Sequence, residues 1–151
     1  MSEDNVLTTD AQLQAKLRAA GLRVTRPRLA LCRLLFAHAP RHVTAKDVYA
    51  ETRAAGLALS PATVQRTLRC LEHLGLIRKL AVGGAEHLFD TDPSDHHHIL
   101  LEQDGTLIDV RHGTGIADLP TLPRGVRVKG VDVIIRLECD ARDRAAVLRK
   151  G

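Results

Sequence analysis

The sequence predicts an α+β fold in two parts: a helical first part that ends in a β-hairpin, and a smaller strand-rich second part. Four stretches within residues 9–75 carry helix start and stop signals. Short apolar runs then flank Gly83-Gly84, as in a hairpin. Further strand-like runs follow residue 98. With 151 residues, the chain has room for one average domain or two small ones.

The four predicted helices each begin at a capping residue and end at a glycine or before a proline. Thr9 and Thr44 have Gln12 and Asp47 three residues later, the spacing of a capping box. Prolines in the first turns of the second and fourth helices fit this position. The start and stop residues, in chain order, are Thr9 and Gly21, Thr25 and Pro40, Thr44 and Gly56, and Ser60 and Gly75.

Strands at 76–82 and 86–90 complete the element order of a winged helix, in which the helix before the hairpin enters the DNA major groove. The fourth helix has an apolar face of Val64, Leu68 and Leu71. Residues 1–90 hold 13 basic and 8 acidic residues, whereas residues 91–151 hold 9 and 10. The basic first part therefore favours binding to double-stranded DNA, the alternative being an ordinary solvated face. That opposite face carries Ala62, Arg66, Arg69 and His73.

The remainder reads as a hinge and a small sheet. Residues 91–98 form the predicted hinge, 99–101 and 107–110 a hairpin around an Asp-Gly turn, and 126–129 and 131–137 further strands. A loop at 113–125, with a helical turn at 116–119, and a last helix from Asp140 to about Lys150 are also expected. Because so small a sheet buries little apolar surface by itself, we expect the protein to form a homodimer, with Ile134 as a candidate interface residue. The predicted domains are 1–90 for DNA binding, 91–98 as hinge, and 99–151 for dimerisation and sensing.

Three consecutive histidines end the hinge. On a strand, His96 and His98 point to one face, so they can bind one ion or haem iron together, while Asp95 and His97 face a second position. Asp90 and Asp109 end neighbouring predicted strands and can reach the same space. Imidazole and carboxylate ligands suit Fe²⁺, Mn²⁺ or Zn²⁺. The alternative is a solvated polar linker.

The composition of the chain and the absence of certain motifs exclude several classes of protein. Hydrophobic residues make up 44% and charged residues 26%, an ordinary globular composition. No stretch of about 18 apolar residues predicts a membrane span, and the polar N-terminus is unlike a signal peptide, so a cytoplasmic protein is expected. The three cysteines form no CxxC, and Cys32 and Cys70 are read as core thiols. Without a phosphate-binding loop, HExxH or GxSxG, we expect no enzyme. A metal-storage or metal-delivery protein is the alternative from another class, and a small metallohydrolase is a further alternative.

From about Leu13 to Leu137, the chain resembles the ferric uptake regulator (Fur) family of metal-responsive transcription factors. The matching stretches are LRAAGLRVTRPR at 17–28, RHVTAKDVY at 41–49, SPATVQRTL at 60–68 and LFD at 88–90. FDTDPSDHHH at 89–98 and VDVIIRL at 131–137 are most similar to the iron response regulator (Irr) branch. The resemblance implies a homodimer that binds inverted-repeat operators and regulates iron and haem genes, with a peroxide sensor of the same family as the alternative.

The resemblance also implies roles for individual residues. It adds His42 to the metal ligands, giving the set His42, Asp90, His96, His98 and Asp109. Thr63, Gln65 and Arg66 are expected to read bases or adjacent phosphates, Arg23 to reach the minor groove, and Arg28 and Arg69 to contact phosphates.

Four departures from the family pattern stand out. Leu101 and Asp104 occupy the positions of the CxxC pair that binds structural zinc, so no such zinc is expected. Gln65 stands where tyrosine is usual, and glutamine can pair with adenine. Gly130 or Val131 stands where a second metal site needs histidine, and no Cys-Pro haem motif occurs. Haem binding would therefore depend on the histidines.

Overall fold

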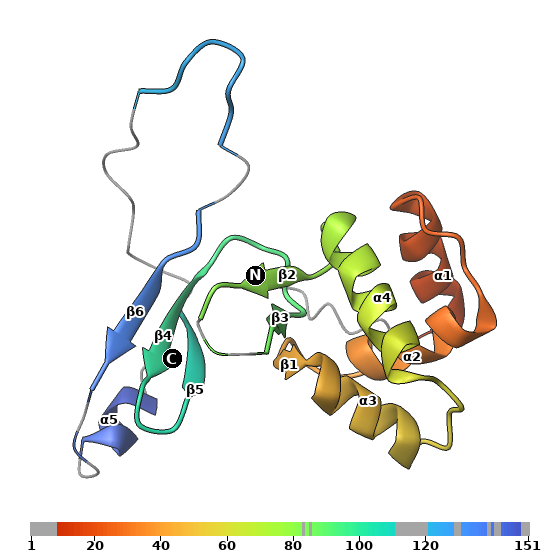
Figure 1. Cartoon of the computed structure of the whole chain (residues 1–151), viewed down its shortest axis with the longest axis horizontal. Helices are drawn as coiled ribbons and strands as arrows, with labels where there is room; N and C mark the ends of the chain where they lie inside the picture. The colour runs from red at the N-terminus through yellow and green to blue at the C-terminus, as the bar shows by residue number, and fades with distance from the viewer. Residues whose placement is uncertain are drawn as a thin grey trace. The chain divides into compact units, whose positions relative to one another are not determined.

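The computed structural model describes residues 9–82, 84, 86–110, 121–128, 131–138, 140 and 143–148 of the chain (Figure 1). The chain divides into two compact units, of which the first ends at Pro93 and the second begins at Ser94. Each unit is described by itself below.

The first unit contains the four predicted helices, each beginning at its predicted cap. Thr9 and Thr44 form complete capping boxes with Gln12 and Asp47. Gly75 ends the fourth helix with a φ of +70°, and the Leu76 amide donates to the Leu71 carbonyl at 2.9 Å, the bond of a Schellman motif. The helices are α1 (Asp10–Ala19), α2 (Arg26–Phe36), α3 (Ala45–Ala54) and α4 (Pro61–His73).

A small antiparallel sheet accompanies these helices. The hairpin strands β2 (Arg78–Leu80) and β3 (Leu88–Asp90) are shorter than the predicted runs at 76–82 and 86–90. A third strand, β1 (His42–Thr44), was missed because three residues that end at a helix cap are too few to show an alternation of their own. The strand order is β1-β3-β2, and the register places His42 opposite Asp90.

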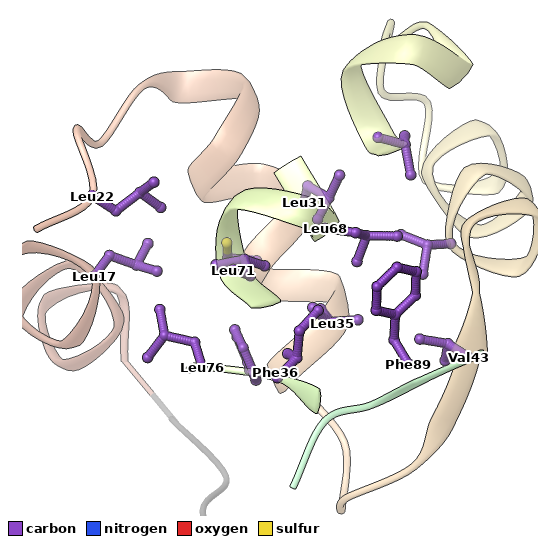
Figure 2. Close-up of a cluster of buried hydrophobic side chains, with 14 of the residues drawn as sticks. Leu17, Leu22, Leu31, Leu35, Phe36, Val43, Leu68, Leu71, Leu76 and Phe89 are labelled. Atoms are coloured by element: carbon purple, nitrogen blue, oxygen red, sulfur yellow. The ribbon is translucent and has the colours of Figure 1, made fainter. Parts of the chain in front are cut away.

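One hydrophobic core holds the helices and this sheet together (Figure 2). The predicted apolar face of α4 is fully buried, whereas Ala62, Arg66, Arg69 and His73 on its opposite face are exposed. Burial of each valine or leucine side chain of this face contributes about 1.5–3 kcal/mol to the free energy of folding. The helix is therefore anchored through one face and presents the other to solvent.

The second unit is a three-stranded sheet with a short helix. Its strands are β4 (His97–Leu101), β5 (Thr106–Val110) and β6 (Ile134–Leu137), in the order β5-β4-β6, and its helix is α5 (Arg144–Leu148). The predicted Asp-Gly hairpin joins β4 to β5, whereas β6 pairs with β4 in parallel. His98 lies opposite Asp109 in this register.

Several boundaries in the second unit were predicted wrongly. Residues 126–128 form no strand, since β6 occupies the free edge of β4 directly. The predicted strand at 131–137 begins at Ile134, and the last helix at Arg144 rather than directly after Asp140. The predicted helical turn at 116–119 lies outside the described residues. None of the described helices is long and apolar enough to span a bilayer.

Candidate functional site

The first unit places two of the expected metal ligands opposite each other at the end of the β1–β3 ladder. His42 Nε2 lies 3.9 Å from Asp90 Oδ2. The Asp90 side chain is fully buried, and its other oxygen, Oδ1, accepts a hydrogen bond of 2.8 Å from the Asp92 amide. The sheet therefore fixes one carboxylate oxygen and turns the other towards the imidazole.

The second unit brings the other three expected ligands together. The rings of His96 and His98 lie 4.6 Å apart between centroids, as the predicted alternation requires. Asp109 Oδ1 lies 3.6 Å from His96 Nε2 and 3.5 Å from His98 Nε2. His96 Nδ1 donates to the Ser94 carbonyl at 2.8 Å, because a carbonyl only accepts, and this bond leaves Nε2 to serve as the ligand atom.

These separations suit a metal better than direct hydrogen bonds. Imidazole–carboxylate hydrogen bonds are about 2.7–3.2 Å long. Two ligand atoms that are each about 2.1 Å from a tetrahedral ion lie about 3.4 Å apart. The 3.5 and 3.6 Å distances at Asp109 match that spacing. Both histidines are almost completely buried. The donor set, nitrogen with carboxylate oxygen, fits Fe²⁺, Mn²⁺ or Zn²⁺.

The second position expected around Asp95 and His97 is less complete. Asp95 is exposed and His97 is half-buried at the start of β4. In the described part of the chain, no group of three ligand side chains forms around these two residues.

The expected DNA-contacting residues lie around two hollows of the first unit. The first hollow, about 360 Å³, lies where α2 and α4 begin, and none of the described residues that line it is acidic. Thr25 and Thr67 also line this hollow and were not predicted, since only the fold brings residues about 40 positions apart together. Its lining residues include Arg23, Arg28, Thr63 and Arg66.

The second hollow, about 450 Å³, lies between α3, α4 and the hairpin. Gln65 and Arg69 of α4 line it together with Lys46 at the start of α3 and His87 of the hairpin, neither of which was predicted. Glu86 also lines this hollow. The six expected DNA contacts thus divide between two neighbouring depressions on either side of α4.

Among the described residues, Cys32 and Cys70 belong to no group of side chains that could hold a metal ion. Cys32 is fully buried, and this burial raises the pKa of its thiol to about 12, as expected of a core thiol. Cys70 packs half-buried against the same core. At the positions of the family's zinc cysteines, Leu101 is buried, and Asp104 accepts from the Thr106 amide and pairs with Arg144.

The fold and these residues define a class of protein: a basic winged-helix unit joined to a small α/β unit that carries histidine and carboxylate candidate ligands. Residues 19–133 match the sequence model of the ferric uptake regulator family. The chain belongs to this family of metal-responsive transcriptional regulators, whose members bind DNA and dimerise.

Similar proteins support this membership. The peroxide-responsive repressor PerR of Staphylococcus aureus is 33% identical over 98 residues, which are 65% of this chain and 66% of the repressor. The structure of the ferric uptake regulator from Pseudomonas aeruginosa with manganese is 25% identical, with a TM-score of 0.65 over 83% of this chain and 96% of that one. The Vibrio cholerae ferric uptake regulator shares the fold at 20% identity, with a TM-score of 0.62 over 84% of this chain and 99% of that one.

Proposed function

We propose that this protein is a homodimeric repressor or activator whose binding to an inverted-repeat operator is controlled by one divalent metal ion. His42 and Asp90 of the first unit, with His96, His98 and Asp109 of the second, are the proposed ligands. The observation that carries the proposal is the spacing of the ligand atoms of His96, His98 and Asp109, which suits a single ion. When bound, the ion supplies positive charge that holds these side chains together.

The proposed regulation follows from where the ligands stand in the chain. They lie on both sides of the boundary between Pro93 and Ser94. An ion that takes ligands from both units favours the arrangement in which all five converge. It shifts the population only by its differential affinity for that arrangement. DNA affinity then depends on the ion without any metal contact to DNA.

The proposed DNA-reading face is α4 with its two flanking hollows. Gln65, Arg66 and Arg69 are exposed on α4, and the arginine-lined hollow beside it suits a phosphate. Gln65 is proposed to pair with adenine. A two-fold dimer presents two such helices and therefore requires a two-fold symmetric operator.

Iron and haem genes are the proposed targets, because the segments at 89–98 and 131–137 resemble the iron response regulator branch. A metal ion is preferred over haem as the ligand, since His96 and His98 are only 4% and 1% exposed and converge on a carboxylate.

A peroxide sensor is the second candidate, favoured by the 33% identity to a peroxide-responsive repressor. In this case Fe²⁺ held by the same residues would supply the redox chemistry for oxidation of a ligand histidine. The net reaction consumes one H₂O₂, adds one oxygen atom to an imidazole carbon and releases water. Mass spectrometry of the histidine peptides after peroxide treatment distinguishes the candidates: an added oxygen with Fe²⁺ but not with Mn²⁺ identifies the sensor.

Selection of operators from random double-stranded DNA tests the main proposal. The selection is run with the metal-free protein and with added Mn²⁺, anaerobic Fe²⁺ or haem. We expect an inverted repeat to be enriched in a Mn²⁺- or Fe²⁺-dependent manner. Enrichment only with haem would refute the choice of a metal ion. Tight metal binding without any enriched sequence would support a storage or delivery protein instead.

A further inference from the structure

Arg41 and Thr91 extend the β1–β3 ladder beyond the candidate ligands His42 and Asp90. The Thr91 amide donates to the Arg41 carbonyl at 3.0 Å, and the Arg41 amide donates to Thr91 Oγ1 at 2.9 Å. Both strands are only three residues long, and His42 and Asp90 form the last pair of their ladder. Without these two bonds, the ligand pair would lie at an open end of the sheet.

The Arg41 side chain connects this end of the sheet to two helices. Its guanidinium donates to both carboxylate oxygens of Glu51 on α3, at 2.6 and 2.7 Å, and to the Leu34 carbonyl of α2 at 3.3 Å. Such a two-pronged, charge-assisted contact has a fixed geometry. The side chains of Arg41 and Glu51 are 26% and 34% exposed, so solvent screens their attraction only in part. The bond raises the pKa of Arg41 and lowers that of Glu51, hence both groups stay charged near neutral pH.

We propose that Arg41 is a positioning residue for metal binding, which acts through Glu51 and Thr91 to hold His42 and Asp90 in place. The inference rests on the proposed function, because it concerns the same metal site. The Asp92 amide holds Asp90 Oδ1, and the pairing of β1 with β3 sets His42 opposite Asp90. Arg41 fixes that placement from the β1 side. Groups that orient metal ligands typically contribute 10–100-fold to metal affinity.

Two conservative substitutions test this role. Thr91→Val removes the acceptor of the Arg41 amide with little change of shape, and Glu51→Gln removes the negative charge while keeping one acceptor oxygen. Asp10→Asn is the matched control, because it weakens another ion pair of the same unit, Asp10 with Arg33 between α1 and α2. The full-length protein is titrated with Mn²⁺ against a competing fluorescent chelator, and the thermal midpoint of the metal-free protein is measured in parallel.

Thr91→Val and Glu51→Gln should each weaken Mn²⁺ binding by about tenfold or more. Asp10→Asn should leave Mn²⁺ affinity within about twofold at a similar loss of thermal stability. Equal Mn²⁺ affinity in wild type and both test variants would overturn the inference, as would an equally large loss of affinity in Asp10→Asn. A wild-type protein that does not bind Mn²⁺ would instead count against the proposed function.

A combined substitution gives an independent readout. If Glu51 acts through the placement of His42, Glu51→Gln should cause no further loss of Mn²⁺ affinity once His42→Ala is present. Additive losses in the double variant would show that Glu51 acts elsewhere and would contradict the inference. In the metal-free protein, Glu51→Gln should also shift and broaden the imidazole NMR signals of His42, whereas Asp10→Asn should leave them unchanged.

Discussion

Replacement of both His96 and His98 by alanine should abolish the response of the protein to metal. Of the three donors that the second unit contributes, only the Asp109 carboxylate would remain. Nothing else in the described part of the second unit forms such a group. The fold should survive, because β4 keeps its apolar residues Leu100 and Leu101 in place.

The size of the effect follows from ligand count and mass action. Metal binding at a four-ligand structural zinc site contributes about 10–16 kcal/mol, or roughly 2.5–4 kcal/mol for each ligand. Loss of two ligands should therefore weaken the affinity of the protein for the ion by about 10⁴-fold. At an ion concentration 100-fold above the wild-type Kd, binding stabilises the folded state by about 2.7 kcal/mol. For a chain of this size, that energy raises Tm by roughly 5–11 °C.

Thermal unfolding with and without Mn²⁺ measures this response, and His97→Ala is the control. Wild type and His97→Ala should show the rise in Tm, since His97 alternates to the other face of β4. The double variant should show none. A rise that persists in the double variant would refute the ligand assignment. A rise lost only in His97→Ala would place the ion on the opposite face, with Asp95.

Three further predictions concern DNA binding, zinc and acid stability. A dimer with about 6–10 phosphate contacts should give a slope of log K for DNA binding against log salt concentration of roughly −5 to −9. Arg66→Ala should weaken the free energy of DNA binding by about 1–3 kcal/mol and relax the sequence preference. A uniform loss of affinity across all DNA sequences would instead make Arg66 a phosphate contact. Prolonged treatment with a metal chelator should leave the circular dichroism spectrum and the sedimentation of the dimer unchanged, because Leu101 and Asp104 replace the cysteines that bind structural zinc. Loss of the dimer would show that a different metal site has the structural role. The pKa of Glu51 is lowered from 4.5 by Arg41, so its stabilisation is present above about pH 4.5 and lost below it. Acid titration of stability should therefore be less steep in Glu51→Gln, and identical curves would contradict this.

Local signals in the sequence predicted the elements that local interactions form. The caps at Thr9, Thr25, Thr44 and Ser60 are side-chain hydrogen bonds to amides three residues away, so their residue types identify them. The alternation that brings His96 and His98 together is equally local. Strand β1 could not be found this way, because His42–Thr44 becomes a strand only through its pairing with Leu88–Asp90, more than 40 residues away.

The same distinction explains which site residues were found. His42 has no local feature of a ligand, and only the family resemblance indicated it. Residues 126–128 have an apolar–basic alternation typical of a strand, yet β6 takes the partner that they would need. The arginine-lined hollow unites Arg23 and Arg28 of one segment with Arg66 of another. No spacing rule predicts that grouping, since it depends on how α2 packs against α4.

Arg41 is an example of a residue whose proposed role in metal binding depends on contacts between distant parts of the sequence. In the sequence it is one of 22 basic residues, and although it begins the family-matching stretch at 41–49, no local pattern assigns it a structural role. In the fold, it joins the end of β1 to Glu51, ten residues later, and to Thr91, fifty residues later. A binding site made of residues brought together by pairing needs such supports, because ligand identity alone does not fix ligand position. We therefore expect metal affinity in this protein to depend also on Arg41, a residue that does not belong to the proposed ligand set.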